Sequence, residues 1–175
     1  MKQLLIFDLD DTLIETHSVF LRITNEILAR MEDEGIIDDN LYYTFDSFDQ
    51  EMVEEAGSFK LELFAKAAEK TYDFYCQKLN LEYKDETAME LMEIAWQIKT
   101  AEHRLVDGAK DLLDELWNDD DFTMVLVTRG DEDSQRQKIK NSGLKHYFAE
   151  TYVVENKTPQ VYAEIMRLHG FEPSA

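Results

Sequence analysis

The stretch that decides the fold is Leu4-Leu5-Ile6-Phe7-Asp8-Leu9-Asp10-Asp11-Thr12-Leu13, close to the N-terminus. A short apolar run is followed at once by a cluster of acids. Such a run, bounded by polar residues, is typical of a strand that is covered on both faces in a parallel sheet. Because ligands bind beyond the carboxyl ends of the strands in such sheets, we expect Asp8 and Asp10 to lie where chemistry takes place.

Two further apolar runs indicate strands, namely Met124-Val125-Leu126-Val127 and Thr151-Tyr152-Val153-Val154. The polar stretch from Asp133 to Ser142 lies between them and is closed by Gly143, which is typical of a helix with a glycine stop. A strand, a helix and a strand in this order require a crossover and therefore parallel pairing. The sequence thus predicts an α/β protein with a parallel sheet.

The segment from 16 to 103 has a different pattern and is predicted to be helical. Apolar residues recur there at helical spacing, for example Phe20, Ile23, Ile27 and Met31. These helices could also pack on the sheet, as in many α/β proteins. However, about 110 residues separate the first two strands, whereas a βαβ crossover needs only ~30, so we favour an insert. The predicted domains are 1–15 with 104–175 as a core, and 16–103 as a helical insert.

Composition excludes several classes of partner. The chain has 18 Lys and Arg against 38 Asp and Glu, a formal net charge of −20, which repels polyanions such as nucleic acid and anionic membrane surfaces. Cys76 is the one cysteine, so no intrachain disulfide can form. No apolar run approaches the length of a membrane span. We therefore expect a cytoplasmic protein that binds neither nucleic acid nor membranes.

Asp8 and Asp10 are the strongest candidates for catalysis. Paired acids allow one carboxylate to attack while its neighbour handles protons. An acidic turn in a very acidic protein is the alternative. The position directly after a buried-type strand favours the functional interpretation.

This first stretch resembles the first motif of the haloacid dehalogenase-like (HAD) hydrolases. The second motif of that family, an apolar strand that ends in Thr or Ser, is matched by Met124-Val125-Leu126-Val127-Thr128. The third, a lysine near the start of the helix after the next strand, is matched by Lys157 in Glu155-Asn156-Lys157-Thr158-Pro159. The resemblance covers the chain in outline and implies a Rossmann-like HAD core with an inserted α-helical cap.

The resemblance also implies roles for single residues. Asp8 would be the nucleophile, and Asp10 would protonate the leaving group and then activate water. Thr128 and Lys157 would bind the phosphoryl group. Arg129 follows Thr128 in the sequence, and either contact with the phosphate or the substrate or a salt bridge to a neighbouring acid is open to it. Mg²⁺ would be held by the Asp8 side chain and the Asp10 backbone carbonyl, both hard oxygen ligands.

The fourth family motif, which normally gives a carboxylate to Mg²⁺, has no match before Ala175. Gly130-Asp131-Glu132-Asp133 is superficially similar, but it follows Thr128 directly and precedes Lys157, so we interpret it as a loop and helix cap. The core is therefore expected to be C-terminally incomplete and to bind metal weakly. The first strand would then be an apolar sheet edge, through which the chain could self-associate.

The resulting hypothesis is an Mg²⁺-dependent HAD-type phosphatase that acts on a small phosphorylated metabolite through an aspartyl-phosphate. Asp10 favours a phosphatase, because relatives without that second acid tend toward dehalogenase, phosphonate or ATPase chemistry. A cap that closes over the site favours a small phosphomonoester. Two alternatives stay open: a phosphomutase that uses the same first motif, and a non-catalytic HAD-like binding protein.

Overall fold

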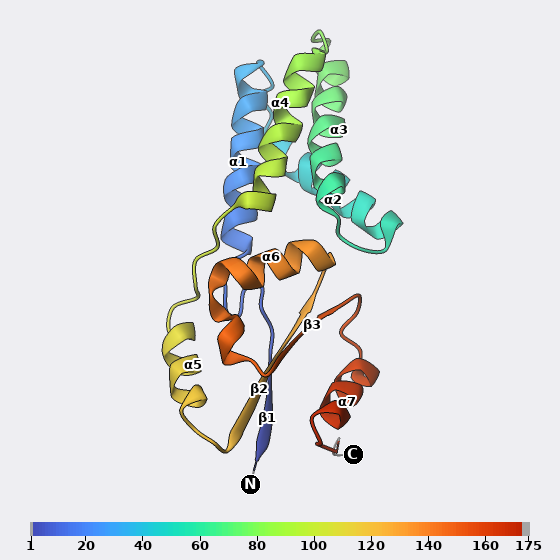
Figure 1. Cartoon of the computed structure of the whole chain (residues 1–175). Helices are drawn as coiled ribbons and strands as arrows, with labels where there is room; N and C mark the ends of the chain where they lie inside the picture. Colours follow the sequence, from blue (N-terminus) through green and yellow to red (C-terminus); the bar gives the residue numbers. More distant parts are fainter. Residues whose placement is uncertain (1, 173–175) are drawn as a thin grey trace. The chain divides into compact units, whose positions relative to one another are not determined.

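The computed structural model describes residues 2–172, and the chain divides into two compact units (Figure 1). One unit combines the residues up to His17 with those from Glu102 onward, and the other spans Ser18–Ala101. The sequence placed these boundaries after residue 15 and before residue 104.

The first unit, here called the core unit, is built on a parallel sheet. Its strands are β1 (Gln3–Phe7), β2 (Phe122–Arg129) and β3 (Glu150–Val154), in the order β1-β2-β3. The registers pair Leu5 with Met124 and Val127 with Tyr152. The three predicted strands and their parallel pairing are confirmed. Within the described residues β1 lies at one edge of the sheet.

Helices cover both faces of this sheet. They are α5 (Ala109–Trp117), α6 (Glu132–Ser142), the 3₁₀ helix η2 (Leu144–Tyr147) and α7 (Pro159–Leu168). Leu113, Ile139 and Leu144 from α5, α6 and η2 pack with Leu126 on one face. Ile165 of α7 packs with Val125 and Val127 on the other (Figure 1).

The ends of α6 follow the sequence signals. The Asp131 carboxylate accepts a hydrogen bond of 2.9 Å from the Ser134 backbone N–H, so it satisfies one of the free donors of the first turn. Gly143 ends the helix in the left-handed region, with φ 71°, where glycine is unstrained. The interpretation of 130–133 as a loop and helix cap is confirmed.

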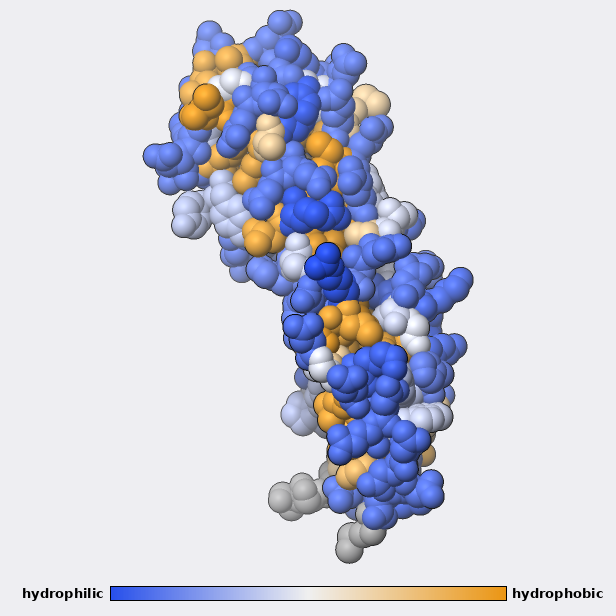
Figure 2. Space-filling model, turned by 90° about the vertical axis from the view of Figure 1, so that its left-hand side faces the viewer, coloured by the Kyte–Doolittle hydropathy of each residue, from blue (hydrophilic) through white to orange (hydrophobic). Residues whose placement is uncertain are grey.

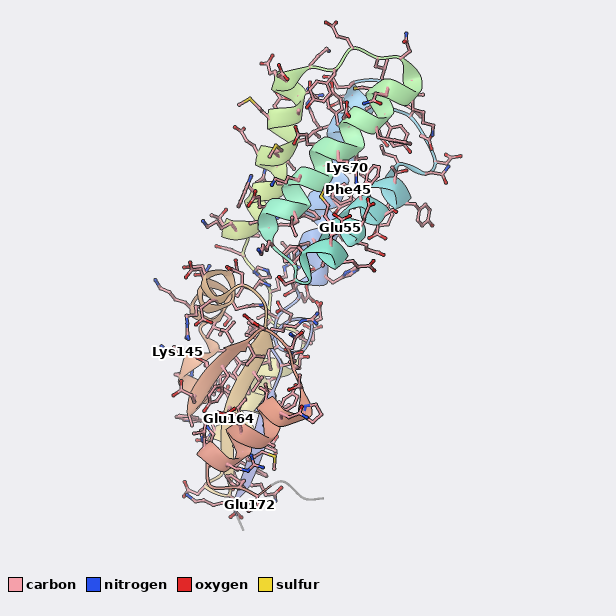
Figure 3. All side chains as sticks on the ribbon, turned by 90° about the vertical axis from the view of Figure 1, so that its right-hand side faces the viewer. Phe45, Glu55, Lys70, Lys145, Glu164 and Glu172 are labelled. Atoms are coloured by element: carbon pink, nitrogen blue, oxygen red, sulfur yellow. The ribbon has the colours of Figure 1, made fainter. Side chains whose placement is uncertain are left out.

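The second unit, here called the helical unit, contains no strand among its residues. Its helices are α1 (His17–Asp33, which begins in the core unit), α2 (Leu41–Ala56), α3 (Leu61–Leu79), α4 (Asp85–Trp96) and the 3₁₀ helix η1 (Gln97–Thr100). Ile23, Ile27 and Met31 of α1 enter its core at the expected spacing. Phe45 of α2, labelled in Figure 3, places its ring 5.2 Å from that of Phe64 of α3, centroid to centroid.

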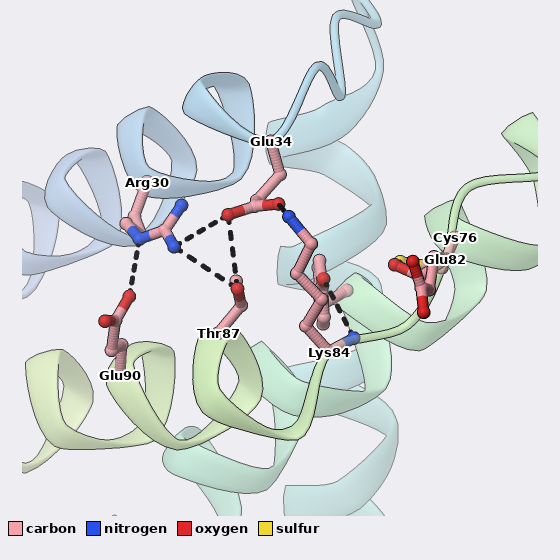
Figure 4. A network of polar contacts seen from close by, with 8 residues as sticks. Arg30, Glu34, Cys76, Glu82, Lys84, Thr87 and Glu90 are labelled. Carbon is pink, nitrogen blue, oxygen red and sulfur yellow. Dashed lines mark hydrogen bonds and ion pairs between the residues drawn. The ribbon is translucent and has the colours of Figure 1, made fainter.

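A polar network joins α1 to α4 in the helical unit (Figure 4). The Arg30 guanidinium bonds Glu34 at 2.8 Å and Glu90 at 2.7 Å, and Lys84 bonds the other Glu34 oxygen at 2.7 Å. Hydrogen bonds from Lys84 and Arg30 lower the pKa of Glu34 to about 2. The Glu34 carboxylate is therefore held in its charged form by Arg30 of α1 and by Lys84, which directly precedes α4.

The visible surface is mainly hydrophilic (Figure 2). Hydrophilic residues cover most of the visible face of each unit, and hydrophobic residues form separate patches (Figure 2). None of the helices in residues 2–172 is long and apolar enough to cross a bilayer.

Candidate active site

A tight loop after β1 presents the two candidate acids. Leu9 and Leu13 are buried, and the Leu13 N–H donates to the Leu9 carbonyl at 2.9 Å. Asp11 adopts a left-handed backbone with φ 54°, and its carboxylate accepts from the backbone N–H groups of Thr16 and His17 at 2.9 and 2.8 Å. The buried leucines thus anchor the loop that carries the acids.

Asp8 directly follows β1 and faces a lysine. Its Oδ1 accepts from the Leu9 backbone N–H at 2.7 Å and from Lys157 Nζ at 2.5 Å. The Asp8 side chain is 42% exposed, so it is accessible to a ligand. Lys157 lies between β3 and α7, and the parallel sheet brings the ends of β1 and β3 to the same edge.

Asp10 is more enclosed and has donors on both oxygens. Its Oδ1 accepts from Lys138 Nζ at 2.7 Å and from the Thr16 hydroxyl at 2.5 Å. Its Oδ2 accepts from Gln135 Nε2 at 2.9 Å and from the Thr128 hydroxyl at 3.4 Å. The Asp10 carboxylate is therefore fixed by residues from its own loop, β2 and α6.

The environment of Asp10 favours its charged form. Burial raises the pKa of this carboxyl, but the facing Lys138 charge and hydrogen bonds from Lys138, Thr16 and Gln135 outweigh it. The pKa of Asp10 is therefore lowered from its ordinary value. This arrangement therefore holds Asp10 in its carboxylate form.

Thr128 and Arg129 end β2 but differ in exposure. Thr128 is fully buried, and its hydroxyl donates to Asp10. The Arg129 side chain is exposed, and its backbone carbonyl accepts from Gln135 Nε2 at 2.8 Å. The structure thus brings Thr128 to Asp10 and Lys157 to Asp8. The role of Arg129 stays a prediction.

The sequence analysis did not single out Lys138 and Gln135, both on α6. They lie three residues apart, a spacing that places side chains on the same helix face. No signal in the sequence indicated Gln135, because its burial depends on how α6 packs and not on the periodicity of the helix. Nothing in the sequence distinguished Lys138 from Lys140, the other lysine of that helix.

The donor set suits magnesium in type but not in number. The Asp8 carboxylate and the Asp10 backbone carbonyl are hard oxygen donors, as Mg²⁺ prefers. Both side-chain oxygens of Asp10 already accept hydrogen bonds. Within residues 2–172 no group of three His, Cys, Asp or Glu side chains forms a metal site. In this part of the chain, the Asp8 carboxylate and the Asp10 backbone carbonyl are the two groups that would hold Mg²⁺.

The comparison with protein families decides the identity. A model of the haloacid dehalogenase-like hydrolases matches residues 2–175. The chain belongs to this family. It is accordingly a hydrolase of the HAD type with the α/β fold described above. No curated protein sequence matches the chain significantly.

Solved structures agree on the fold. A haloacid dehalogenase-like hydrolase from Xanthomonas campestris matches with a TM-score of 0.72 and 19% identity, covering 97% of this chain and 70% of that one. A magnesium-bound putative HAD hydrolase from Bacillus subtilis, YfnB, matches with 0.51 and 21%, covering 98% and 66%. An L-2-haloacid dehalogenase from Xanthobacter autotrophicus matches with 0.55 and 18%, covering 99% and 67%.

These similarities leave the chemistry of the HAD chain open. The chain spans 66–70% of these three structures, and identities this low show the fold alone. A dehalogenase and a magnesium-bound hydrolase both occur among them, so the reaction must be argued from the residues of the site.

Proposed function

We propose that this HAD chain is a phosphatase that hydrolyses a small phosphomonoester through an aspartyl-phosphate on Asp8. The observation that carries the proposal is the second carboxylate, Asp10, held at the same strand end by hydrogen-bond donors on both oxygens. A reaction that leaves an alcohol or phenol needs a group that moves protons, and Asp10 is placed to do so. Among members of the resembled family, this second acid is the feature associated with phosphatases.

In the first step Asp8 attacks the phosphorus. A new bond forms between an Asp8 carboxylate oxygen and phosphorus, the ester P–O bond breaks, and the leaving oxygen takes a proton from Asp10. The dianionic phosphate disfavours the charged form of Asp10, which raises its proton affinity when substrate is bound. Lys157 lies at Asp8 and can offset the repulsion between the attacking carboxylate and the phosphate.

In the second step water hydrolyses the aspartyl-phosphate. Asp10, now ionised, takes a proton from the water as its oxygen bonds to phosphorus. The P–O bond to Asp8 breaks, so the Asp8 carboxylate is regenerated and inorganic phosphate is released. The ionised form required here is the one that Lys138, Thr16 and Gln135 favour.

Phosphate binding involves the hydroxyl of Thr128, the ammonium of Lys157 and, we propose, the exposed Arg129. Thr128 lies next to Asp10, so a phosphoryl oxygen at this point replaces the long hydrogen bond between them. Mg²⁺, held by the Asp8 carboxylate and the Asp10 backbone carbonyl, would supply charge neutralisation between the nucleophile and the phosphoryl group. The helical unit would serve as a cap that favours small substrates over macromolecules.

Turnover of p-nitrophenyl phosphate by the full chain tests this function. We expect release of p-nitrophenolate that depends on added Mg²⁺ and is abolished in Asp8→Asn. Tight binding of a phosphate ester without turnover would instead support the non-catalytic binding protein. Transfer of the phosphoryl group between two hydroxyls of one sugar, with little release of phosphate, would support the phosphomutase.

Activity toward 2-haloacids is the alternative for which the comparisons give a reason, because an L-2-haloacid dehalogenase shares the fold. Halide release from a 2-haloacid without phosphatase activity would overturn the proposed reaction. We expect no halide release, because a halide leaving group needs no proton and would give Asp10 no task in the first step.

A further inference from the structure

We propose that Lys138 and Gln135 of α6 are positioning residues that clamp the Asp10 carboxylate for proton transfer. The inference rests on the proposed function and adds two residues that the family motifs do not provide. Both act through Asp10.

The clamp holds the carboxylate at two points. Lys138 Nζ donates to Oδ1 at 2.7 Å and Gln135 Nε2 donates to Oδ2 at 2.9 Å, so each oxygen has its own donor from the same helix. The Thr16 and Thr128 hydroxyls also donate to these oxygens, from the loop and from β2. Two donors from a rigid helix fix both its position and its plane, as proton transfer to a leaving group requires.

Gln135 can act in one orientation only. Its Nε2 donates both to Asp10 and to the backbone carbonyl of Arg129, at 2.9 and 2.8 Å. Rotating the amide by half a turn would place its oxygen against two acceptors. The oxygen Oε1 is buried and has no hydrogen-bond partner within the described residues, which is an unfavourable state for an amide. This cost is accepted because the Nε2 group of the same amide links Asp10, which follows β1, to Arg129 at the end of β2.

Gly130 makes this close approach possible. Its φ is 150°, a conformation that favours glycine, and a Cβ built there would lie 2.7 Å from Gln135 Nε2. A side chain at position 130 would therefore push the amide away from Asp10. The turn between β2 and α6 is shaped around the Gln135 contact.

Lys138 is distinguished from the other lysine near it on the helix. Its side chain is only 15% exposed and faces Asp10, whereas Lys140 is exposed. Lys157 contacts Asp8, so each of the two acids has its own lysine. A charged Asp10 that is half-buried needs such a cation, and Lys138 provides it from the helix that also carries Gln135.

Two substrates with different leaving groups test the clamp. p-Nitrophenolate leaves readily without a proton, whereas the alkoxide of ethyl phosphate needs one from Asp10. In Lys138→Met we expect kcat/KM to fall about 100-fold for ethyl phosphate, as for a misplaced catalytic group, and to stay nearly unchanged for p-nitrophenyl phosphate. Because kcat/KM covers steps up to cleavage of the ester, slow hydrolysis of the intermediate does not mask this difference.

Matched variants separate positioning from charge and folding. Lys138→Arg should restore most of the lost kcat/KM for ethyl phosphate, because it keeps a side-chain donor for Oδ1 of Asp10. Gln135→Met should show the same preference for the better leaving group. Lys140→Met and Gln137→Met alter exposed positions of α6 and should behave as wild type. An equal fall for both substrates in Lys138→Met would indicate a merely structural role and overturn the proposal.

A second measurement does not depend on turnover. Melting temperatures of Asp10→Asn, Lys138→Met and the double variant form a cycle, in which we expect clear non-additivity because the two side chains are in contact. Additive shifts would overturn the clamp even in an active enzyme. If the wild-type chain cleaves no phosphate ester, the proposed function fails, and this cycle alone then decides whether Lys138 holds Asp10.

Discussion

The helical unit and the core unit both contain ion pairs between basic and acidic side chains. The two sets differ in what they connect. The pairs among Arg30, Glu34 and Lys84 connect α1 and α4, whose apolar side chains already pack in one hydrophobic core. The pairs Asp8–Lys157 and Asp10–Lys138 instead lie at the carboxyl edge of the sheet, where the acids follow β1. We infer that the first set mainly affects stability, and the second mainly chemistry. Each of the following variants tests that separation.

The largest effect is expected from Asp8→Asn. Removing the nucleophile should lower turnover of p-nitrophenyl phosphate by about 10⁴-fold or more, since loss of a nucleophile removes the covalent route. The melting temperature should change little, because Asp8 is accessible to solvent. Glu34→Gln is the matched control, and we expect a lowered melting temperature with nearly normal turnover. A lowered melting temperature with normal turnover in Asp8→Asn, together with lost turnover in Glu34→Gln, would contradict the assignment of stability to one region and chemistry to the other.

Packing of the helical unit is tested by Ile27→Ala. Ile27 is fully buried in α1, so its truncation should lower the free energy of unfolding by about 2–5 kcal/mol. Leu21→Ala, at an exposed position of the same helix, should change it by less than about 0.5 kcal/mol. Urea unfolding followed by circular dichroism provides the measurement. Equal losses in both variants would mean that α1 does not pack as described.

The Glu34 network predicts acid sensitivity. The pKa of Glu34 is about 2 in the folded chain and near 4.5 when unfolded, so its stabilising contribution is present above about pH 4.5. It is lost as the pH falls toward 2. The difference in melting temperature between wild type and Glu34→Gln should therefore shrink between pH 5 and 2. A difference that stays constant over this range would contradict the pairing shown in Figure 4.

Asp49 of α2 should show the opposite and smaller trend. Burial, with a contribution from Asp46, raises the pKa of Asp49 to about 6, and its Oδ1 is buried without a partner in the described part of the chain. A raised carboxyl pKa lowers stability as the pH rises from about 4 to 6. Asp49→Asn should thus raise the melting temperature at pH 8 and have little effect at pH 3.5. The exposed control Asp39→Asn should show no such dependence.

The sequence allowed most of the fold to be predicted, because its signals are local. Apolar runs indicated the three strands, and Gly143 correctly indicated the end of α6. Local signals do not determine details that depend on competing contacts. Asn40 occupies the N-cap position of α2, but its side chain makes no capping bond, and instead its backbone N–H donates to Asp38.

The candidate site was only partly predictable for the same reason. Motif order indicated Asp8, Asp10, Thr128 and Lys157, and the parallel sheet explains why they meet. Nothing in the polar pattern of α6 distinguished Lys138 and Gln135, since their contact with Asp10 depends on how α6 packs after the turn at Gly130. The direction of the Thr128 hydroxyl, toward Asp10, likewise depends on three-dimensional packing.

The most direct test is to trap the phosphoryl intermediate. The full chain would be mixed with p-nitrophenyl phosphate and Mg²⁺, quenched in acid, reduced with borohydride and digested for mass spectrometry. An acyl phosphate on Asp8 is reduced to the alcohol, so the account predicts homoserine at position 8 in the wild type and none in Asp8→Asn. Turnover with the modification at another residue, or with none at all, would contradict it.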